Sequence, residues 1–241
     1  MAHGNPLFNE KAFQQTLTQV RPDKVMTLQG TINKTFFLLF LCVISGMFVW
    51  NNYQLVAPFL VPIVIGTFIV AMITIFCKSA APILAPVYAI GEGIVLGTIS
   101  AAYQAQYQGI VGQAIVITLL VFGLMLFLYK TGIIKVTRTF IIGVTAATGA
   151  IALFYLGSLV VGLFGVQVPY FTSTSGLSIG INVGICIVAA LNFAIDFHFI
   201  DTLTSQVSAP KYMEWYSAFS LMVTLVWLYM EILRLLSRSR K

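Results

Sequence analysis

Seven long apolar runs, separated by short polar segments, constrain this chain more than any other feature. Hydrophobic residues make up 59% of the sequence and charged residues 8%, whereas a soluble globular protein carries about 25% charged residues. A helix needs ~20 apolar residues to cross the bilayer, which is close to the length of each run. A membrane-spanning backbone must satisfy its own hydrogen bonds, so continuous rather than alternating apolar runs favour helices over a barrel. The sequence predicts an all-α integral membrane protein.

The predicted architecture is a bundle of seven transmembrane helices. The expected spans are about Thr35–Trp50, Val56–Phe76, Ala80–Tyr103, Ile110–Tyr129, Thr139–Phe164, Leu177–Ile200 and Glu214–Leu236. Residues 1–33 form a polar N-terminal tail, residues 34–236 the seven-helix domain, and residues 237–241 a basic C-terminal tail.

Basic residues gather at the ends of alternate spans, which sets the expected orientation. They lie before the first span and in the second-to-third, fourth-to-fifth and sixth-to-seventh connections: Lys11, Arg21, Lys24, Lys34, Lys78, Lys130, Lys135, Arg138 and Lys211. The positive-inside rule then predicts a cytoplasmic N-terminus. Seven full spans place the basic C-terminal tail on the side of the membrane opposite the N-terminus, which conflicts with the same rule. The sequence therefore does not decide on which side the C-terminal tail lies. Charges at span ends point to the lipid bilayer as partner, and not to nucleic acid.

Glycines recur every four residues in two spans and predict close helix packing. Gly93 and Gly97 show this spacing in the third span, and Gly176, Gly180 and Gly184 show it in the sixth. Small residues at this interval let two helix backbones approach closely.

Three acidic residues fall inside apolar runs, namely Glu92, Asp196 and Glu231. Intramembrane ionisable groups normally face the bundle interior or a wet cavity. Asp196 follows an uncharged run and is the main functional candidate, with a structural hydrogen bond as the alternative. Glu92 lies between two glycines, so a close-packing role is an equal alternative. Glu231 has Arg234 three residues later, which favours a structural ion pair.

A polar stripe runs along the seventh span. Its residues are spaced 3, 4, 3, 4 and 3 apart and are Ser217, Ser220, Thr224, Trp227, Glu231 and Arg234. That spacing places them on one face of a helix. Because a polar stripe in lipid must point at protein or water, the last helix is expected to be central, facing the acids of other spans.

The expected topology brings Asp196, Thr224 and Lys78 to the cytoplasmic side, with Glu92 deeper along the same path. Burial raises the pKa of a carboxyl group and a nearby lysine lowers it, so such a cluster can act as a switch. An entering cation competes with both the proton and the lysine. Calcium takes six to eight oxygen ligands, so Asp196 and Glu92 with polar neighbours predict a weak transit site. Asp201, at the aqueous end of the sixth span, is a secondary candidate.

Enzyme signatures are absent from the sequence. It contains no Walker loop, no H-E-x-x-H motif and no G-x-S-x-G motif. Two histidines and three scattered cysteines do not make a convincing metal site. We therefore expect neither enzyme activity nor a bound cofactor beyond transient calcium.

Three segments resemble the Bax inhibitor-1 (transmembrane Bax-inhibitor-motif) membrane proteins. They are NFAIDF at 192–197, LYMEILRLL at 228–236 and AIGEGIVLG at 89–97. Asn5-Pro6, MTLQG at 26–30 and KYMEWYSAF at 211–219 look closest to a bacterial branch. The resemblance implies six helices in two layers around a central seventh.

The same resemblance implies a pH-sensitive calcium leak gated by an aspartate pair on the last two helices. Asp196 matches the first aspartate, whereas Thr224 stands at the position of the second. Lys78 lies near the place where relatives have a basic latch. The expected function is a proton-sensitive cation leak of the bacterial inner membrane. The alternative is a non-conducting regulator that binds other membrane proteins, such as a quality-control protease, through the tail at 5–34. A proton-coupled transporter ranks third.

Overall fold

The computed structural model describes residues 25–165, 170, 175–205 and 209–240, and the expected tail at 1–33 therefore lies mostly outside it. The helices are α2 (Leu28–Trp50), α3 (Tyr53–Val56), η2 (Ala57–Phe59), α4 (Leu60–Phe76), η3 (Lys78–Ala80), α5 (Ala81–Gln106), α6 (Ile110–Lys130), α7 (Arg138–Leu163), α9 (Gly176–Ser205) and α10 (Met213–Ser239). Within these ranges, seven helical segments are long and apolar enough to cross a membrane, as the sequence predicts.

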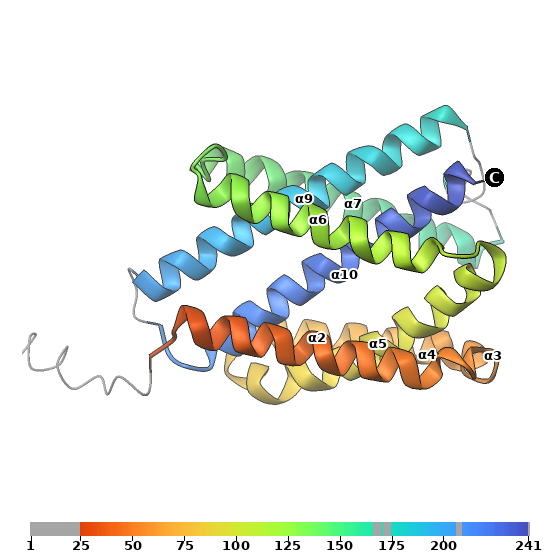
Figure 1. Ribbon diagram of the computed structural model, residues 1–241, viewed down its shortest axis with the longest axis horizontal. Coiled ribbons are helices and arrows are strands. Elements are labelled where there is room, and N and C mark those ends of the chain that lie inside the picture. Colours follow the sequence, from red (N-terminus) through yellow and green to blue (C-terminus); the bar gives the residue numbers. More distant parts are fainter. Residues whose placement is uncertain (1–24, 166–169, 171–174, 206–208, 241) are drawn as a thin grey trace, which may run out of the picture.

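The last helix crosses the middle of the bundle. In Figure 1, α10 runs obliquely between one layer that contains α2, α4 and α5 and another that contains α6, α7 and α9. It packs against α2 and α5 on one side and against α6 and α9 on the other. A larger share of its apolar stretch is buried than in any other span in the described ranges. The prediction of a central seventh helix is therefore confirmed.

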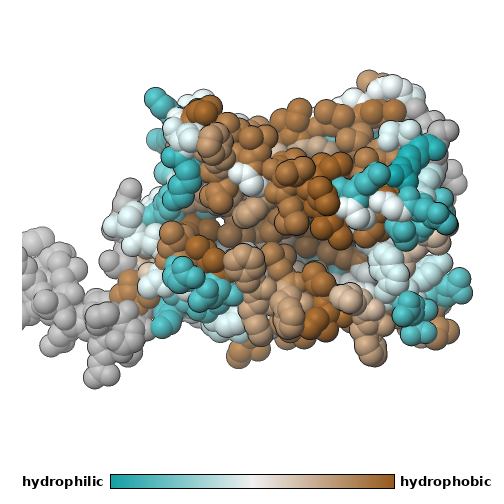
Figure 2. Space-filling model, viewed as in Figure 1, coloured by the Kyte–Doolittle hydropathy of each residue, from teal (hydrophilic) through white to brown (hydrophobic). Residues whose placement is uncertain are grey.

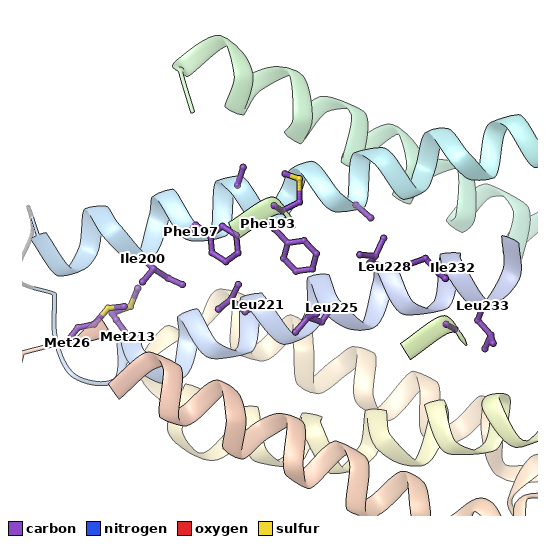
Figure 3. Close-up of a cluster of buried hydrophobic side chains, with 14 of the residues drawn as sticks. Met26, Phe193, Phe197, Ile200, Met213, Leu221, Leu225, Leu228, Ile232 and Leu233 are labelled. Atoms are coloured by element: carbon purple, nitrogen blue, oxygen red, sulfur yellow. The ribbon is translucent and has the colours of Figure 1, made fainter. Parts of the chain in front are cut away.

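Two apolar cores meet on opposite faces of α10. The larger lies against α9 and α6, where Phe193 and Phe197 face Leu221, Leu225 and Leu228 (Figure 3). The smaller lies against α2 and α5 and consists of Leu38, Cys42, Ala71, Ala85, Tyr88, Ala89, Ala218, Phe219 and Met222. Both faces of α10 are thus held by packing, which fixes the direction of its remaining polar side chains.

The outer surface carries the pattern of a membrane protein. Figure 2 shows a broad hydrophobic belt with hydrophilic residues gathered at both ends of the molecule. Large apolar side chains such as Phe48, Phe76 and Leu153 are mostly exposed on this surface. Apolar side chains facing outward across the full width of a helix bundle are suited to lipid and not to water.

The first helix begins earlier than the expected span. Thr27 caps α2, and its hydroxyl accepts a hydrogen bond from the Gly30 amide, so the helix starts at Leu28 instead of near Thr35. A threonine at this position satisfies one of the amides that a helix start leaves unpaired.

The two glycine series behave differently. Gly97 packs against Gly46 of α2, and a Cβ added there would lie 2.6 Å from the Gly46 Cα. By contrast, a Cβ added at Gly176, Gly180 or Gly184 would meet nothing within 4 Å among the described residues. Close packing is therefore confirmed for the third span, whereas the expectation for the sixth is wrong within this single chain.

The C-terminal end of α10 lies at the opposite end of the bundle from the start of α2 (Figure 1). The charge conflict noted in the sequence is reduced here because Arg238 is buried. It donates hydrogen bonds to the backbone carbonyls of Tyr170 and Ser178, and its guanidinium lies 4.4 Å from the Tyr170 ring centroid. This arginine ties the start of α9 to α10 and is not a free loop charge.

Candidate intramembrane acid site

Asp196 of α9 points at α10 and is held there by two hydroxyl groups. Ser220 Oγ donates to Asp196 Oδ1 at 2.6 Å, and Thr224 Oγ1 donates to Asp196 Oδ2 at 2.7 Å. Ser220 and Thr224 are four residues apart, so both project from one face of α10. The Asp196 side chain is buried, with 9% of the residue exposed. Each carboxylate oxygen therefore has its own donor inside the membrane domain.

No cationic side chain forms an ion pair with Asp196 in the described part of the chain. The ion pairs found there involve Glu214, Asp201 and Glu231. A charged carboxylate in an apolar environment costs several kcal/mol unless its charge is compensated. The hydroxyl donors reduce that cost without removing the charge. The site thus has a place for one positive charge, which a proton or a metal cation could supply.

Lys78 approaches this region but interacts with an aromatic ring. Its ammonium lies 5.3 Å from the ring centroid of Tyr216, one helical turn before Ser220. Tyr216 is itself within electrostatic range of Asp196. The contact of Lys78 in the structure is thus a cation–π interaction with Tyr216.

Glu92 lies in the other layer of the bundle. It sits on α5 within electrostatic range of Cys42 and Tyr88, beside Gly93, which packs against the Cys42 carbonyl. Among the residues with defined positions, no hydrogen bond or ion pair joins Glu92 to Asp196. The close-packing alternative for this segment agrees with the contacts of Gly93. A shared metal site of Glu92 and Asp196 is not formed in this arrangement.

A second polar cluster lies toward the far end of α10, around Glu231. This carboxylate is 1% exposed and accepts hydrogen bonds from Tyr155 of α7 at 2.6 Å and Asn182 of α9 at 2.8 Å. Arg234 contacts both of its oxygens, at 2.9 and 3.0 Å, and also donates to the Tyr155 hydroxyl. The expected Glu231–Arg234 pair is present, and it joins three helices.

Asp201 forms a third, more exposed contact at the end of α9. It accepts a hydrogen bond from the Tyr129 hydroxyl at 2.8 Å, and Lys130 lies 4.0 Å away. These contacts tie the ends of α6 and α9 together. An exposed pair of this kind contributes little to stability.

Three partners of the buried acids were not singled out as site residues from the sequence. Ser220 was part of the polar stripe, and its position one turn before Thr224 is the signal that could have assigned it. Tyr155 and Asn182 lie on other helices, α7 and α9, and spacing within one helix does not indicate which residues of another helix it faces. Three-dimensional contacts alone identify them.

The described residues include no group of three or more histidines, cysteines, aspartates or glutamates that could hold a metal ion. Asp196, Ser220 and Thr224 together offer four oxygens, which is fewer than calcium normally takes from its ligands. Water would have to complete the shell, so this donor set fits a passing cation better than a stored one.

Comparison with known families gives a match that covers nearly the whole chain. The model of the family described as Bax inhibitor 1 like matches residues 5–241. Comparison with curated proteins and with solved structures gives no match. The central last helix and the two surrounding layers agree with the architecture that the resemblance to this family implies. The chain belongs to the Bax inhibitor 1 like family.

Proposed function

We propose that this protein is a passive cation leak of the membrane, with calcium as the expected ion, controlled by protonation of Asp196. The observation that carries the proposal is a buried carboxylate with two hydroxyl donors and no ion-pair partner among the described residues. Such a group holds a place for a proton or a cation, and the two compete for it. We propose no enzyme activity.

The polar face of α10 supplies a route for the ion in this proposal. Ser220 and Thr224 lie on the half of the helix that starts at Met213, whereas Glu231 and Arg234 lie toward Ser239. On that far half, Arg234 already compensates the charge of Glu231. A cation that moves along α10 would therefore gain no counter-charge at Glu231 and would have to displace Arg234 from it. The Glu231–Arg234–Tyr155 cluster therefore supports a closed resting state.

The proposed orientation places the start of α2 in the cytoplasm. Exposed or interfacial basic residues at that end are Lys78, Lys130, Lys135, Arg138 and Lys211. At the other end Arg238 is buried in contacts with backbone carbonyls, so it counts less as a loop charge. The proposed location is a bacterial inner membrane.

A liposome experiment tests the leak directly. Purified protein is reconstituted with a calcium dye inside the vesicles, and calcium influx is measured over a series of pH values. We expect Asp196→Asn to remove the pH-dependent part of the flux, because an amide cannot exchange a proton for a cation. Asp201→Asn is the matched control and should keep it. Wild-type flux and pH dependence in Asp196→Asn vesicles would contradict gating by this residue.

A non-conducting regulator is the second candidate, and the open glycine face of α9 favours it. A Cβ added at Gly176, Gly180 or Gly184 would meet no other helix within 4 Å in the described part of the chain, although such a face suits close helix contact. If purified wild-type protein gives no flux at any pH, crosslinking from this face in native membranes should recover one specific membrane protein. The tail at 5–34, proposed as a further contact, lies largely outside the described residues.

A further inference from the structure

A buried acid at the start of α10 is bound by the start of α2. Glu214 is completely buried, and its Oε1 accepts two hydrogen bonds from Thr27, one from the backbone N–H and one from the hydroxyl, both at 2.9 Å. Its Oε2 is paired with the Lys34 ammonium. Three donors from one helix start thus surround one carboxylate, and here, unlike at Asp196, the charge is compensated by a cation. We call the set Thr27, Lys34 and Glu214 the clasp.

The clasp is built tightly on both sides. A Cβ added at Gly30 would overlap the Glu214 carboxylate, so an alanine at this point would require the Glu214 side chain to move. Just before it, the Met26 amide donates to the Ala209 carbonyl at 2.7 Å. The Met26 side chain is buried beside Met213 (Figure 3). Residues 25–34 therefore attach to the segment that enters α10.

Aromatic contacts extend the same attachment. The Lys34 ammonium lies 5.4 Å from the ring centroid of Trp215, and Trp215 makes an edge-to-face contact with Phe37 at 5.9 Å. Lys34 thereby contacts two consecutive residues of α10. Both the height and the rotation of the first turn of α10 are defined relative to α2.

That first turn lies close to the hydroxyl groups that hold Asp196. Glu214 precedes Ser220 by six residues and Thr224 by ten, which is roughly 9 and 15 Å along a helix. A change of register by one residue would turn both hydroxyls by about 100° and remove them from Asp196. We propose that the clasp positions α10 so that Ser220 and Thr224 reach Asp196, and that Thr27, Lys34 and Glu214 are therefore positioning residues for the ion site.

Thermal unfolding of the purified full chain tests this coupling without reference to transport. Melting temperatures are compared for Lys34→Met, Ser220→Ala and the double variant, with Lys211→Met as a control that removes an exposed charge at the same end. If the clasp positions the hydroxyls, the double variant should melt well above the value given by adding the two single shifts, because the Ser220–Asp196 bond is already lost in Lys34→Met. The stability changes caused by substitutions at distant, independent sites normally add. Additive shifts would overturn the proposal.

A second variant tests the clasp by its geometry. Gly30→Ala should displace the Glu214 carboxylate and lower the melting temperature as Lys34→Met does. In a Glu214→Ala background the same substitution should have little further effect, because the group it overlaps is gone. An equal loss in both backgrounds would show that Gly30 matters for another reason and would contradict the tight fit that the proposal requires.

The consequence for transport rests on the proposed function. In calcium-loaded liposomes, Lys34→Met should lose the pH-dependent flux to the same extent as Ser220→Ala. Lys34→Arg, which keeps the positive charge, should keep this flux. Absence of flux in the wild type would refute the leak alone, since the melting experiment does not depend on it. Normal pH-dependent flux in Lys34→Met, together with additive melting shifts, would refute the clasp alone.

Discussion

Thr224 of α10 donates a hydrogen bond to Asp196 of α9, with 2.7 Å between Oγ1 and Oδ2. The family resemblance places a second aspartate at position 224, so a hydroxyl donor here replaces an acid. A threonine cannot share a proton with Asp196, but it can stabilise the ionised carboxylate. The site is thus a single acid, Asp196, held by the hydroxyl groups of Ser220 and Thr224. We call these two groups the hydroxyl donors. The charge of the carboxylate must be compensated by a proton or a cation from outside.

Removing the Thr224 hydroxyl should weaken the α9–α10 contact. Thr224→Val keeps the side-chain shape but loses a hydrogen bond to a carboxylate, which corresponds to about 1.5–3 kcal/mol. We expect a lower melting temperature in detergent, with Thr224→Ser close to wild type because it keeps the donor. Equal melting temperatures for the valine and serine variants would mean that the bond contributes nothing to stability.

Much of the fold follows from periodicity in the sequence. The apolar runs predict the number of spans, and the 3–4 spacing of the polar stripe, which includes Ser220, Thr224, Trp227 and Glu231, predicts that α10 is central. The glycines show the limit of such patterns, since Gly97 and Gly180 have the same local spacing but only Gly97 has a helix against it. Spacing describes the shape of a helix face and carries no information about what covers it.

The candidate site was predictable only in part. Asp196 and Thr224 are expected in one cytoplasmic-side cluster because both lie toward the same side of adjacent spans. The clasp between Lys34 and Glu214 joins residues 180 positions apart, and no sequence period links them. The sequence placed Glu214 only as the first residue of the seventh span, whereas in the structure it is buried and bound by Thr27 and Lys34. Such pairs depend on the tertiary packing of α2 and α10.

The two glycine faces should respond oppositely to alanine. Gly97→Ala puts a methyl group against the Gly46 backbone, and overpacking of this kind costs about 1–3 kcal/mol. Gly180→Ala meets open space and gains helix propensity, so it should be neutral or stabilising by up to about 1 kcal/mol. Melting temperatures of the two purified variants provide the check. A loss in Gly180→Ala would show that this face is in contact with another chain under the conditions of the measurement.

The Glu231–Arg234 pair should depend strongly on both partners. Glu231→Gln leaves Arg234 without its counter-charge, and Arg234→Met leaves Glu231 buried and uncompensated, so each should cost about 3–5 kcal/mol. The double variant should lose less than the sum, because no unpaired charge remains. The free energy of unfolding, measured by chemical unfolding of the wild type, the two single variants and the double variant, gives this double-mutant cycle. An additive result would mean that the two charges do not stabilise one another.

Asp196 should behave differently from Glu231 when it is neutralised. Asp196→Asn removes a charge that has no ion-pair partner among the described residues, while the amide can still contact Ser220 and Thr224. We therefore expect an unchanged or higher melting temperature, together with the loss of pH-dependent flux. At functional sites, a substitution that removes activity often leaves stability unchanged or raises it. A large loss of stability would instead assign Asp196 a structural role.

Placing a second acid at position 224 provides the most direct test of the role of the Thr224 hydroxyl beside Asp196. In Thr224→Asp, a carboxylate would stand where a hydroxyl now lies 2.7 Å from Asp196. Two carboxylates at that separation cannot both be ionised unless a proton or a cation lies between them. Calcium flux in liposomes should then depend more steeply on pH than in the wild type, because the two acids titrate as a coupled pair. Thr224→Asn, which has the same size but no charge, is the matched control. If both variants follow the wild-type pH profile, position 224 does not face the ion, and the route along α10 must be rejected.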